Sequence, residues 1–155
     1  MATGFVAGIQ APSISLRIVG PAVGKGRPRV LKTGRTYTPK PTVLAEEAIR
    51  TAWREAGEVR LPDDAAVSLV VQLCIERPAG HFKRDGSLSA EGQRHPIPRR
   101  KPDLDNAAKL VMDALNGFAY RDDAQVASLV VHRFWGSKAG TYVFLMPLYE
   151  RWGSG

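Results

Sequence analysis

The chain has 155 residues, 44% of them hydrophobic, which fits one domain that buries a sizeable core without disulfides or a structural metal. Its 22 Lys and Arg residues exceed its 15 Asp and Glu residues, and the formal charge of +7 favours a polyanionic partner. No apolar run is long enough to span a membrane, no signal-peptide pattern opens the chain, and the single Cys74 cannot form an internal disulfide. We therefore expect a cytoplasmic protein without a membrane partner.

The first elements are predicted from alternation and composition. A loose arm is expected over residues 1–12, followed by a strand over residues 13–19, where apolar and polar residues alternate. Residues 25–40 hold six basic residues, no acid, and several glycines and prolines, so they predict a loop or a short irregular hairpin. A helix is expected to begin at Thr42, which can cap it, and to stop at Gly57.

The second half of the chain repeats this alternation of strand, basic loop and helix. The clearest strand covers residues 65–77, with its odd-numbered side chains toward the core. Residues 78–101 form a long, polar and basic segment that we expect to be a loop. Apolar residues at i, i+3, i+4, i+7 and i+11 predict a second helix over residues 104–115, and residues 124–135 and 141–149 predict a closing β-hairpin.

This order of elements predicts the fold class. We expect a small single domain of the α/β (α+β) class over residues 13–149, with a mixed four-stranded sheet and two helices packed on it. Residues 150–155 are expected to form a C-terminal tail. Both basic segments leave the same predicted sheet, so they could converge on one site.

An acidic stretch directly after three basic residues is the strongest chemical signal. Pro102 disfavours helix before it, so Asp103 is placed as the N-cap of the second helix and Asp105 lies in its first turn. The positive end of the helix dipole favours ionised carboxylates, the form that a hard cation binds. Lys109 lies one turn beyond Asp105 on the same face.

A second acidic pair, Asp122 and Asp123, opens the next predicted strand. If that strand and the helix are antiparallel neighbours, we expect the strand to start beside the helix N-terminus, so that all these carboxylates meet around one cavity. Two or three carboxylates can hold Mg²⁺, which activates water and polarises a phosphoryl group, while a lysine stabilises charge on phosphorus. The pattern therefore indicates a metal-dependent phosphodiesterase acting on a nucleic acid.

The acidic stretch also resembles a known family. The run K-P-D-L-D-N-A-A-K-L-V-M-D-A-L-N-G, followed by Y-R-D-D-A-Q-V, resembles the signature of the RusA family of Holliday junction resolvases, which are common in phages and prophages. G-K-G-R-P-R and G-R-T-Y-T-P-K resemble the amino-terminal part of phage-type members, so the likeness covers roughly residues 13–149. It implies a homodimer in a bacterial host cell that binds four-way or other branched DNA and, with Mg²⁺ or Mn²⁺, nicks two opposed strands symmetrically.

The resemblance also implies roles for individual residues. By position, Asp103, Asp105 and Asp123 match the metal-binding carboxylates of the family, and Lys109 matches its catalytic lysine. Asp122 matches the neighbouring acid, so the choice between Asp122 and Asp123 as the third metal ligand stays open.

Simpler interpretations compete with these roles. Asp103 could be only a helix cap and Asp105 only a first-turn acid. Lys109 and Asp113 could form a solvated helix pair worth about 0.2 to 0.5 kcal/mol, and for Asp113 we keep that interpretation. At the level of function, the alternatives are a non-catalytic protein that binds branched DNA and a general metal-dependent nuclease with little preference for junctions.

The distribution of basic residues favours nucleic acid. Thirteen of the 22 Lys and Arg residues fall in residues 25–40 and 77–101, and such clustering favours phosphate contacts. The candidate DNA-binding residues are Lys25, Arg27, Arg29, Arg35, Lys40, Arg99, Arg100 and Lys101. G-P-A-V-G-K-G lacks one residue and the final Ser or Thr of a P-loop, so no nucleotide cofactor is expected. His81, His95 and His132 show no metal-ligand spacing and receive no role.

Overall fold

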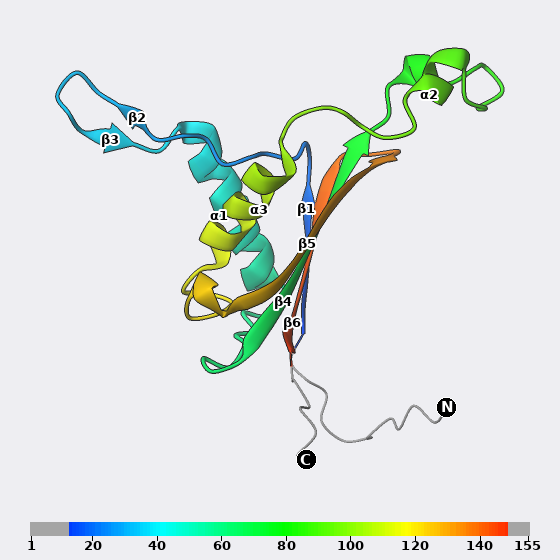
Figure 1. Ribbon diagram of the computed structural model, residues 1–155. Helices are drawn as coiled ribbons and strands as arrows, with labels where there is room; N and C mark the ends of the chain where they lie inside the picture. The colour runs from blue at the N-terminus through cyan, green and yellow to red at the C-terminus, as the bar shows by residue number, and fades with distance from the viewer. Residues whose placement is uncertain (1–12, 149–155) are drawn as a thin grey trace, which may run out of the picture.

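A computed structural model describes residues 13–148, so the predicted arm (1–12) and tail (150–155) lie outside the described residues. Figure 1 shows two layers, with helices on one side of a twisted sheet. None of the helices in this part of the chain is long and apolar enough to cross a bilayer. The elements are β1 (Ile14–Val19), β2 (Arg29–Val30), β3 (Thr36–Tyr37), α1 (Lys40–Glu55), β4 (Ala66–Glu76), the 3₁₀ turn η1 (Ala79–His81), α2 (Ala90–Arg94), α3 (Leu104–Leu115), the 3₁₀ turn η2 (Asp123–Gln125), β5 (Val126–Gly136) and β6 (Gly140–Leu148).

The main sheet has four strands in the order β1-β6-β4-β5, which confirms the predicted mixed four-stranded sheet. β4 pairs antiparallel with β6 and parallel with β5, and β1 pairs antiparallel with β6. The parallel pair follows from the chain path, because α3 lies between β4 and β5 and returns the chain to the starting end of the sheet. β5 and β1 are the two edge strands, and β4 lies between β5 and β6. Both predicted closing strands are therefore present, but the prediction that they form a hairpin with each other is wrong.

The core lies between the sheet and the two long helices, α1 and α3 (Figure 1). Val67, Leu69, Val71 and Leu73 are at most 1% exposed, so the predicted odd-numbered core face of β4 is confirmed. α3 contributes a buried stripe that includes Val111 and Leu115. Each fully buried side chain of this size contributes about 1.5 to 3 kcal/mol of transfer free energy.

α1 begins earlier than predicted, and Thr42 does not cap it. Pro39 occupies the N-cap position and Pro41 lies in the first turn, where a missing backbone N–H is tolerated. Thr42 is buried inside the first turn, and its Oγ1 accepts a hydrogen bond from the N–H of Gly26 at 3.0 Å. The predicted stop is confirmed, because the helix ends at Glu55 and Gly57 adopts φ +103°.

The two basic segments are more ordered than plain loops. The first contains the hairpin β2–β3, one of the two forms that its composition predicted. The second, predicted to be a loop, contains η1, a bridge between Phe82 and Leu88, and the short helix α2. Figure 1 shows the β2–β3 hairpin and the α2 region projecting in opposite directions, with the N-terminal end of α3 between them.

Candidate active site

The N-terminal end of α3 carries the first acidic pair as predicted. The helix spans Leu104–Leu115, and Asp103 occupies its N-cap position with an extended backbone, φ −66° and ψ 147°. Within the described residues, the Asp103 side chain makes no capping hydrogen bond, so its carboxylate is not engaged by the helix. The interpretation of Asp103 as merely a cap therefore lacks the contact that defines a cap.

Asp105 and Lys109 extend this acidic end along one face of α3. The Nζ of Lys109 lies 3.9 Å from Oδ2 of Asp105, and the two side chains are 65% and 70% exposed. An exposed pair at this distance contributes little to stability, about 0.5 kcal/mol or less. Both groups are therefore accessible to a ligand that approaches from solvent.

The first basic segment packs against this end of α3. Lys25, Lys101, Asp103 and Asn106 are among the residues that line a hollow of about 370 Å³. The backbone N–H of Lys25 donates to the carbonyl of Asn106 at 2.9 Å. The expected convergence of a basic segment with the acidic stretch is confirmed at this point.

Gly24 permits the contact between this segment and the helix. A Cβ atom at this position would lie 2.8 Å from Cβ of Pro102 and 3.1 Å from Cβ of Asn106. Ordinary contacts between such atoms begin near 3.4 Å, so any side chain here would separate the segment from the start of α3.

Lys25 itself is held by acids within the chain. Its Nζ forms an ion pair with Asp113 and lies 3.6 Å from Oε1 of Glu46, which also pairs with Arg50 at 3.3 Å. Burial disfavours the charged form of Lys25 and so acts to lower its pKa. The hydrogen bond and the charge of Asp113, followed by the charge and hydrogen bond of Glu46, outweigh burial, so the pKa of Lys25 is raised. The expected pairing of Asp113 with Lys109 is wrong, because Lys25, 88 residues away in sequence, takes that place.

The second acidic pair lies in η2, between α3 and β5. Oδ1 of Asp122 accepts from the N–H of Ala124 at 2.8 Å, and the side-chain oxygen of Gln125 accepts from the N–H of Asp122 at 3.2 Å. This reciprocal arrangement is a capping box, so Asp122 has a structural role at the start of η2. Asp123 is the first residue of the turn and is partly buried.

The two acidic pairs do not meet within one chain. Tyr120, close to Asp123, donates its hydroxyl to the carbonyl of Met112 at 2.8 Å, near the C-terminal end of α3. Nine residues separate Met112 from Asp103, which is about 14 Å along a helix. Figure 1 shows η2 and the start of α3 at opposite ends of that helix.

The predicted antiparallel arrangement of helix and strand is present, and it explains the separation. Arg133, near the end of β5, donates to the carbonyls of Arg100 and Pro102 at 2.7 and 3.2 Å, beside the start of α3. A strand that returns antiparallel to the preceding helix starts beside the C-terminal end of that helix. The expectation that both pairs surround one cavity is therefore wrong for a single chain.

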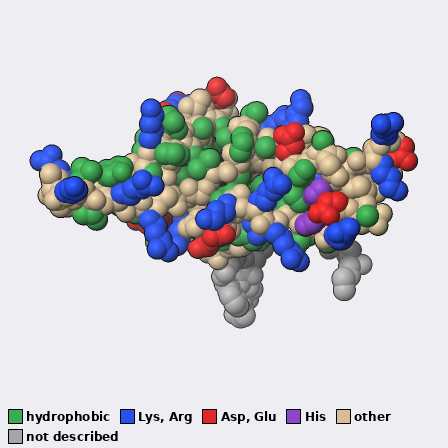
Figure 2. Space-filling view, turned by 90° about the horizontal axis from the view of Figure 1, so that it is seen from above, with side chains coloured by type: hydrophobic (Ala, Val, Ile, Leu, Met, Phe, Trp, Pro, Cys, Tyr) green, Lys and Arg blue, Asp and Glu red, His purple; other side chains and the backbone are tan. Residues whose placement is uncertain are grey.

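The other predicted DNA-binding residues are exposed on an elongated surface. They lie on or next to the β2–β3 hairpin, or in the segment that leads into α3: Arg27, Arg29, Arg35, Lys40, Arg99, Arg100 and Lys101. Figure 2 shows Lys and Arg side chains along the whole length of this face, with acidic side chains between them. This distribution suits a long polyanion, while contact with DNA stays a prediction.

Comparison with known proteins identifies the family. The family model described as endodeoxyribonuclease RusA matches residues 20–146. The chain belongs to the RusA family. Its members are endodeoxyribonucleases, hydrolases that act on DNA, so the resemblance carried by the acidic stretch is confirmed. The RusA match includes both acidic pairs and both basic segments.

A curated relative from Bacillus subtilis (strain 168), the uncharacterized protein YqaN, is 26% identical to this RusA-family chain over 136 residues. The aligned region covers 85% of this chain and 94% of YqaN. The similarity therefore extends over nearly the whole of both proteins and is not confined to the acidic stretch.

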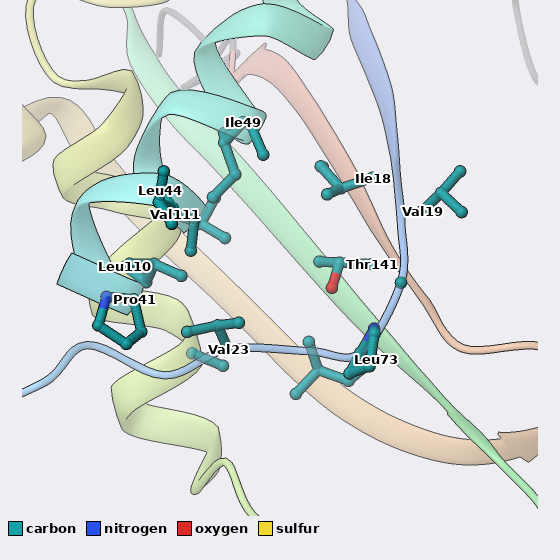
Figure 3. A pocket seen from close by; sticks show the side chains of 15 residues that line it. Ile18, Val19, Val23, Pro41, Leu44, Ile49, Leu73, Leu110, Val111 and Thr141 are labelled. Carbon is teal, nitrogen blue, oxygen red and sulfur yellow. The ribbon is translucent and has the colours of Figure 1, made fainter.

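An apolar cavity of about 280 Å³ lies between α1, α3 and β1, and the segment that follows β1 forms part of its wall (Figure 3). Its walls include Ile18, Val23, Leu44 and Ile49, and among the described residues no titratable side chain lines it. This cavity therefore offers no carboxylate or imidazole that could bind a metal ion or transfer a proton.

Sequence reasoning missed one cluster of potential metal ligands. His81, Glu91 and His95, all in the second basic segment, offer ligand atoms that lie within 4.8 Å of one another. The expectation that these histidines lack ligand spacing is therefore wrong for His81 and His95. The available signal was the i, i+4 spacing of Glu91 and His95, which has meaning only once residues 90–94 are known to be helical.

Proposed function

We propose that this RusA-family protein is a divalent-metal-dependent endonuclease that resolves four-way DNA junctions as a homodimer, by paired and symmetric nicks. The observation that carries the proposal is the family match over residues 20–146. Two copies are required because one cleavage site cuts one strand. The long basic face supports a DNA substrate, and the exposed carboxylates of α3 support hydrolysis at its N-terminal end.

The first acidic pair suits a hard divalent cation. Asp103 and Asp105 offer only carboxylate oxygens, the donors that Mg²⁺ prefers and Mn²⁺ accepts. Both side chains lie at the positive end of α3 and are exposed, so they can bind an ion without breaking a capping contact. When bound, such an ion supplies charge neutralisation at the phosphodiester and activates water for attack.

Lys109 would act on the phosphate itself. Its contact with Asp105 is long, at 3.9 Å, and its side chain is 65% exposed. The ammonium group can therefore turn toward a phosphate oxygen and stabilise the negative charge that develops during cleavage. Lys101 lines the adjacent hollow and would hold a neighbouring phosphate.

Asp123 would join this centre from the partner copy. β5 is an edge strand of eleven residues, and within residues 13–148 no other strand pairs with its outer side. Its exposed side chains include Leu129 and Val130, at 45% and 49%. A long apolar edge strand is a template for pairing with another chain, and a second copy is the occupant we propose.

Antiparallel pairing of β5 with the partner's β5 would complete the centre. In such a two-fold pair the start of one strand lies beside the end of the other. The end of β5 contacts Pro102 through Arg133, and Asp123 lies three residues before Val126, the first residue of β5. The partner's Asp123 would then approach Asp103 and Asp105, and the same contact would build both centres.

Cleavage assays on synthetic substrates test the proposed activity. Wild-type protein with Mg²⁺ is expected to nick four-way junctions in preference to flaps and plain duplex, and EDTA should abolish cleavage. Asp103→Asn and Asp105→Asn should each lose cleavage and keep junction binding, while Glu55→Gln, at the exposed far end of α1, should behave as wild type.

The other outcomes of this assay have distinct meanings. Full cleavage by either aspartate variant would remove that carboxylate from the mechanism. Binding without metal-dependent nicking by wild type would favour the non-catalytic alternative, and equal cleavage of all substrates would favour a general nuclease.

Subunit mixing tests the shared site. Asp103→Asn and Asp123→Asn should each be inactive alone. When equal amounts of the two variants are mixed, about half of the dimers contain one copy of each. In such a dimer one centre carries both substitutions and the other carries neither, so about a quarter of all centres should regain nicking activity. A mixture as inactive as its components would show that each centre is built from one chain.

The β5 contact has its own test. Leu129→Lys should yield monomers in sedimentation and lose paired nicking, whereas Val43→Lys, at a similarly exposed position on α1, should stay dimeric. A dimeric Leu129→Lys variant would exclude β5 as the contact.

A further inference from the structure

Three potential metal ligands lie in the second basic segment, away from the acids of α3. His81 ends η1, Glu91 lies in the first turn of α2, and His95 is the C-cap of α2. Their ligand atoms all lie within 4.8 Å of one another. They line a cavity of about 270 Å³ together with Arg99, Arg100 and Trp135. Figure 2 shows histidine and acidic side chains next to each other toward the α2 end of the molecule.

The backbone around the three ligands is closely packed. Ser89 caps α2 by accepting from the N–H of Gly92 at 3.1 Å, and its own N–H donates to the carbonyl of His81 at 2.9 Å. A Cβ atom on Gly92 would lie 2.3 Å from that same carbonyl oxygen, so only glycine allows α2 to approach His81 this closely. The relative position of η1 and α2 is therefore set before any ion binds.

His81 has an unsatisfied nitrogen. The residue is 9% exposed, and its Nδ1 is one of two buried side-chain polar atoms, among residues 13–148, that lack a hydrogen-bond partner. Buried polar atoms without a partner are rare and call for an explanation such as an absent ion. Burial, followed by the charges of Arg77 and His95, lowers the pKa of His81. The neutral imidazole is the form that binds metals.

The ring of His95 faces Glu91. Its Nδ1 lies 3.0 Å from the carbonyl oxygen and 3.3 Å from the carboxylate Oε1 of Glu91, and a proton on Nδ1 donated to either oxygen leaves Nε2 available to bind an ion. Its ring stacks on that of His81, with centroids 5.4 Å apart and planes at 17°. Trp135 supports both histidines, because its ring meets His81 edge-on at 5.5 Å and its Nε1 donates to the carbonyl of His95 at 2.9 Å.

We propose that His81, Glu91 and His95 bind a transition-metal ion of the Zn²⁺ class, at a site separate from the nuclease carboxylates. Two imidazole nitrogens and one carboxylate oxygen match the donors that Zn²⁺ prefers and differ from the all-oxygen donors of Mg²⁺. Three protein ligands leave a fourth position for water or for an anion held by Arg99 and Arg100.

The geometry requires only a small adjustment. Bonds of about 2.0 to 2.1 Å in a tetrahedral site place ligand atoms roughly 3.4 Å apart, so a separation of 4.8 Å must shrink by about 1.4 Å. The side chains of Glu91 and His95 are 52% and 43% exposed and can rotate by that amount. The nearby arginines oppose a cation, and the carboxylate of Glu91 offsets part of that repulsion.

Bound metal would fix the segment that leads into the active site. Arg77 donates to the carbonyls of Gly92 and His95, at 3.1 and 2.8 Å, and already ties α2 to the end of β4. An ion at His95 would add a cross-link to η1 four residues before Arg99. The site would thus hold Arg99, Arg100 and Lys101 in position without taking part in hydrolysis.

Zinc titration of the full chain tests this site independently of cleavage. The parent is the double variant Asp103→Asn, Asp105→Asn, stripped with EDTA, so that ions at the α3 carboxylates do not contribute. Calorimetry with Zn²⁺ alone should give one ion per chain, and Zn²⁺ should raise the thermal midpoint. Adding Glu91→Gln or His95→Gln should weaken binding by at least tenfold and remove the thermal shift, since each removes a ligand.

His132→Gln is the matched control, because His132 is an exposed histidine on β5 and belongs to no ligand cluster in the described part of the chain. It should bind Zn²⁺ as the parent does. Absence of Zn²⁺ binding by the parent, or unchanged binding after Glu91→Gln and His95→Gln, would overturn the proposal.

Discussion

Gly24→Ala tests whether contact between the first basic segment and α3 builds the active site. The added Cβ would lie 2.8 Å from Cβ of Pro102, about 0.6 Å inside the ordinary contact distance, and 3.1 Å from Cβ of Asn106. The segment must then move, and the hydrogen bond from Lys25 to the carbonyl of Asn106 is lost or stretched. Overpacking of this kind costs about 1 to 3 kcal/mol.

The expected result is a modest loss of stability with a large loss of cleavage. For a domain of this length a cost near 2 kcal/mol lowers the thermal midpoint by about 4 to 8 °C. Gly80→Ala is the control, because a Cβ there meets nothing within 4 Å. Calorimetry and junction cleavage would be measured on both variants. If Gly24→Ala melts and cleaves like Gly80→Ala, the segment does not depend on this contact.

Three further predictions concern stability and DNA affinity. Burial, followed by nearby carboxylates, raises the pKa of Tyr120, so the unfolded chain loses the hydroxyl proton near pH 10 while the folded chain keeps it. The free energy of unfolding should therefore fall above that pH, and it should fall less steeply in Tyr120→Phe. Urea unfolding measured across alkaline pH would test this. Thr42→Val removes the acceptor for the N–H of Gly26 and should cost about 1 to 3 kcal/mol in urea unfolding. Arg27→Ala should weaken DNA binding and reduce by about 1 the slope of log affinity against log salt concentration, whereas Arg54→Ala, at the far end of α1, should change neither. Equal slopes for the two variants in fluorescence titrations would exclude a phosphate contact by Arg27.

Local pattern was sufficient to predict the elements with strong periodicity. The alternation over residues 65–77 predicted β4 to within one residue at each end, because one face of that strand is fully buried and the other is not. α3 was predicted with its observed bounds, since Pro102 and the glycine after Asn116 mark its two ends. Contacts between side chains on one helix face, such as that of Asp105 with Lys109, can also be predicted, because residues four apart in a helix lie on the same face.

Contacts between distant segments could not be predicted from one sequence. The ion pair of Lys25 with Asp113 joins residues 88 positions apart, and no local rule selects that partner over Lys109. The α2 region was predicted to be a loop because its helix has five residues, too few for a periodic signal. The proximity of His81 and His95 depends on that helix, so it could not be predicted either.

The separation of the two acidic pairs has a consequence for how cleavage could be controlled. A helix of twelve residues holds Asp103 and Asp123 apart in each chain, and neither end can bend toward the other without breaking α3. If a centre needs both residues, it exists only where two chains meet, and a two-fold contact that forms one centre also forms the other. Nicking activity per chain would then fall with dilution as dimers dissociate, and it would fall equally for both strands. A monomer would carry DNA-binding residues and half of each metal site, so it could bind DNA without cutting it.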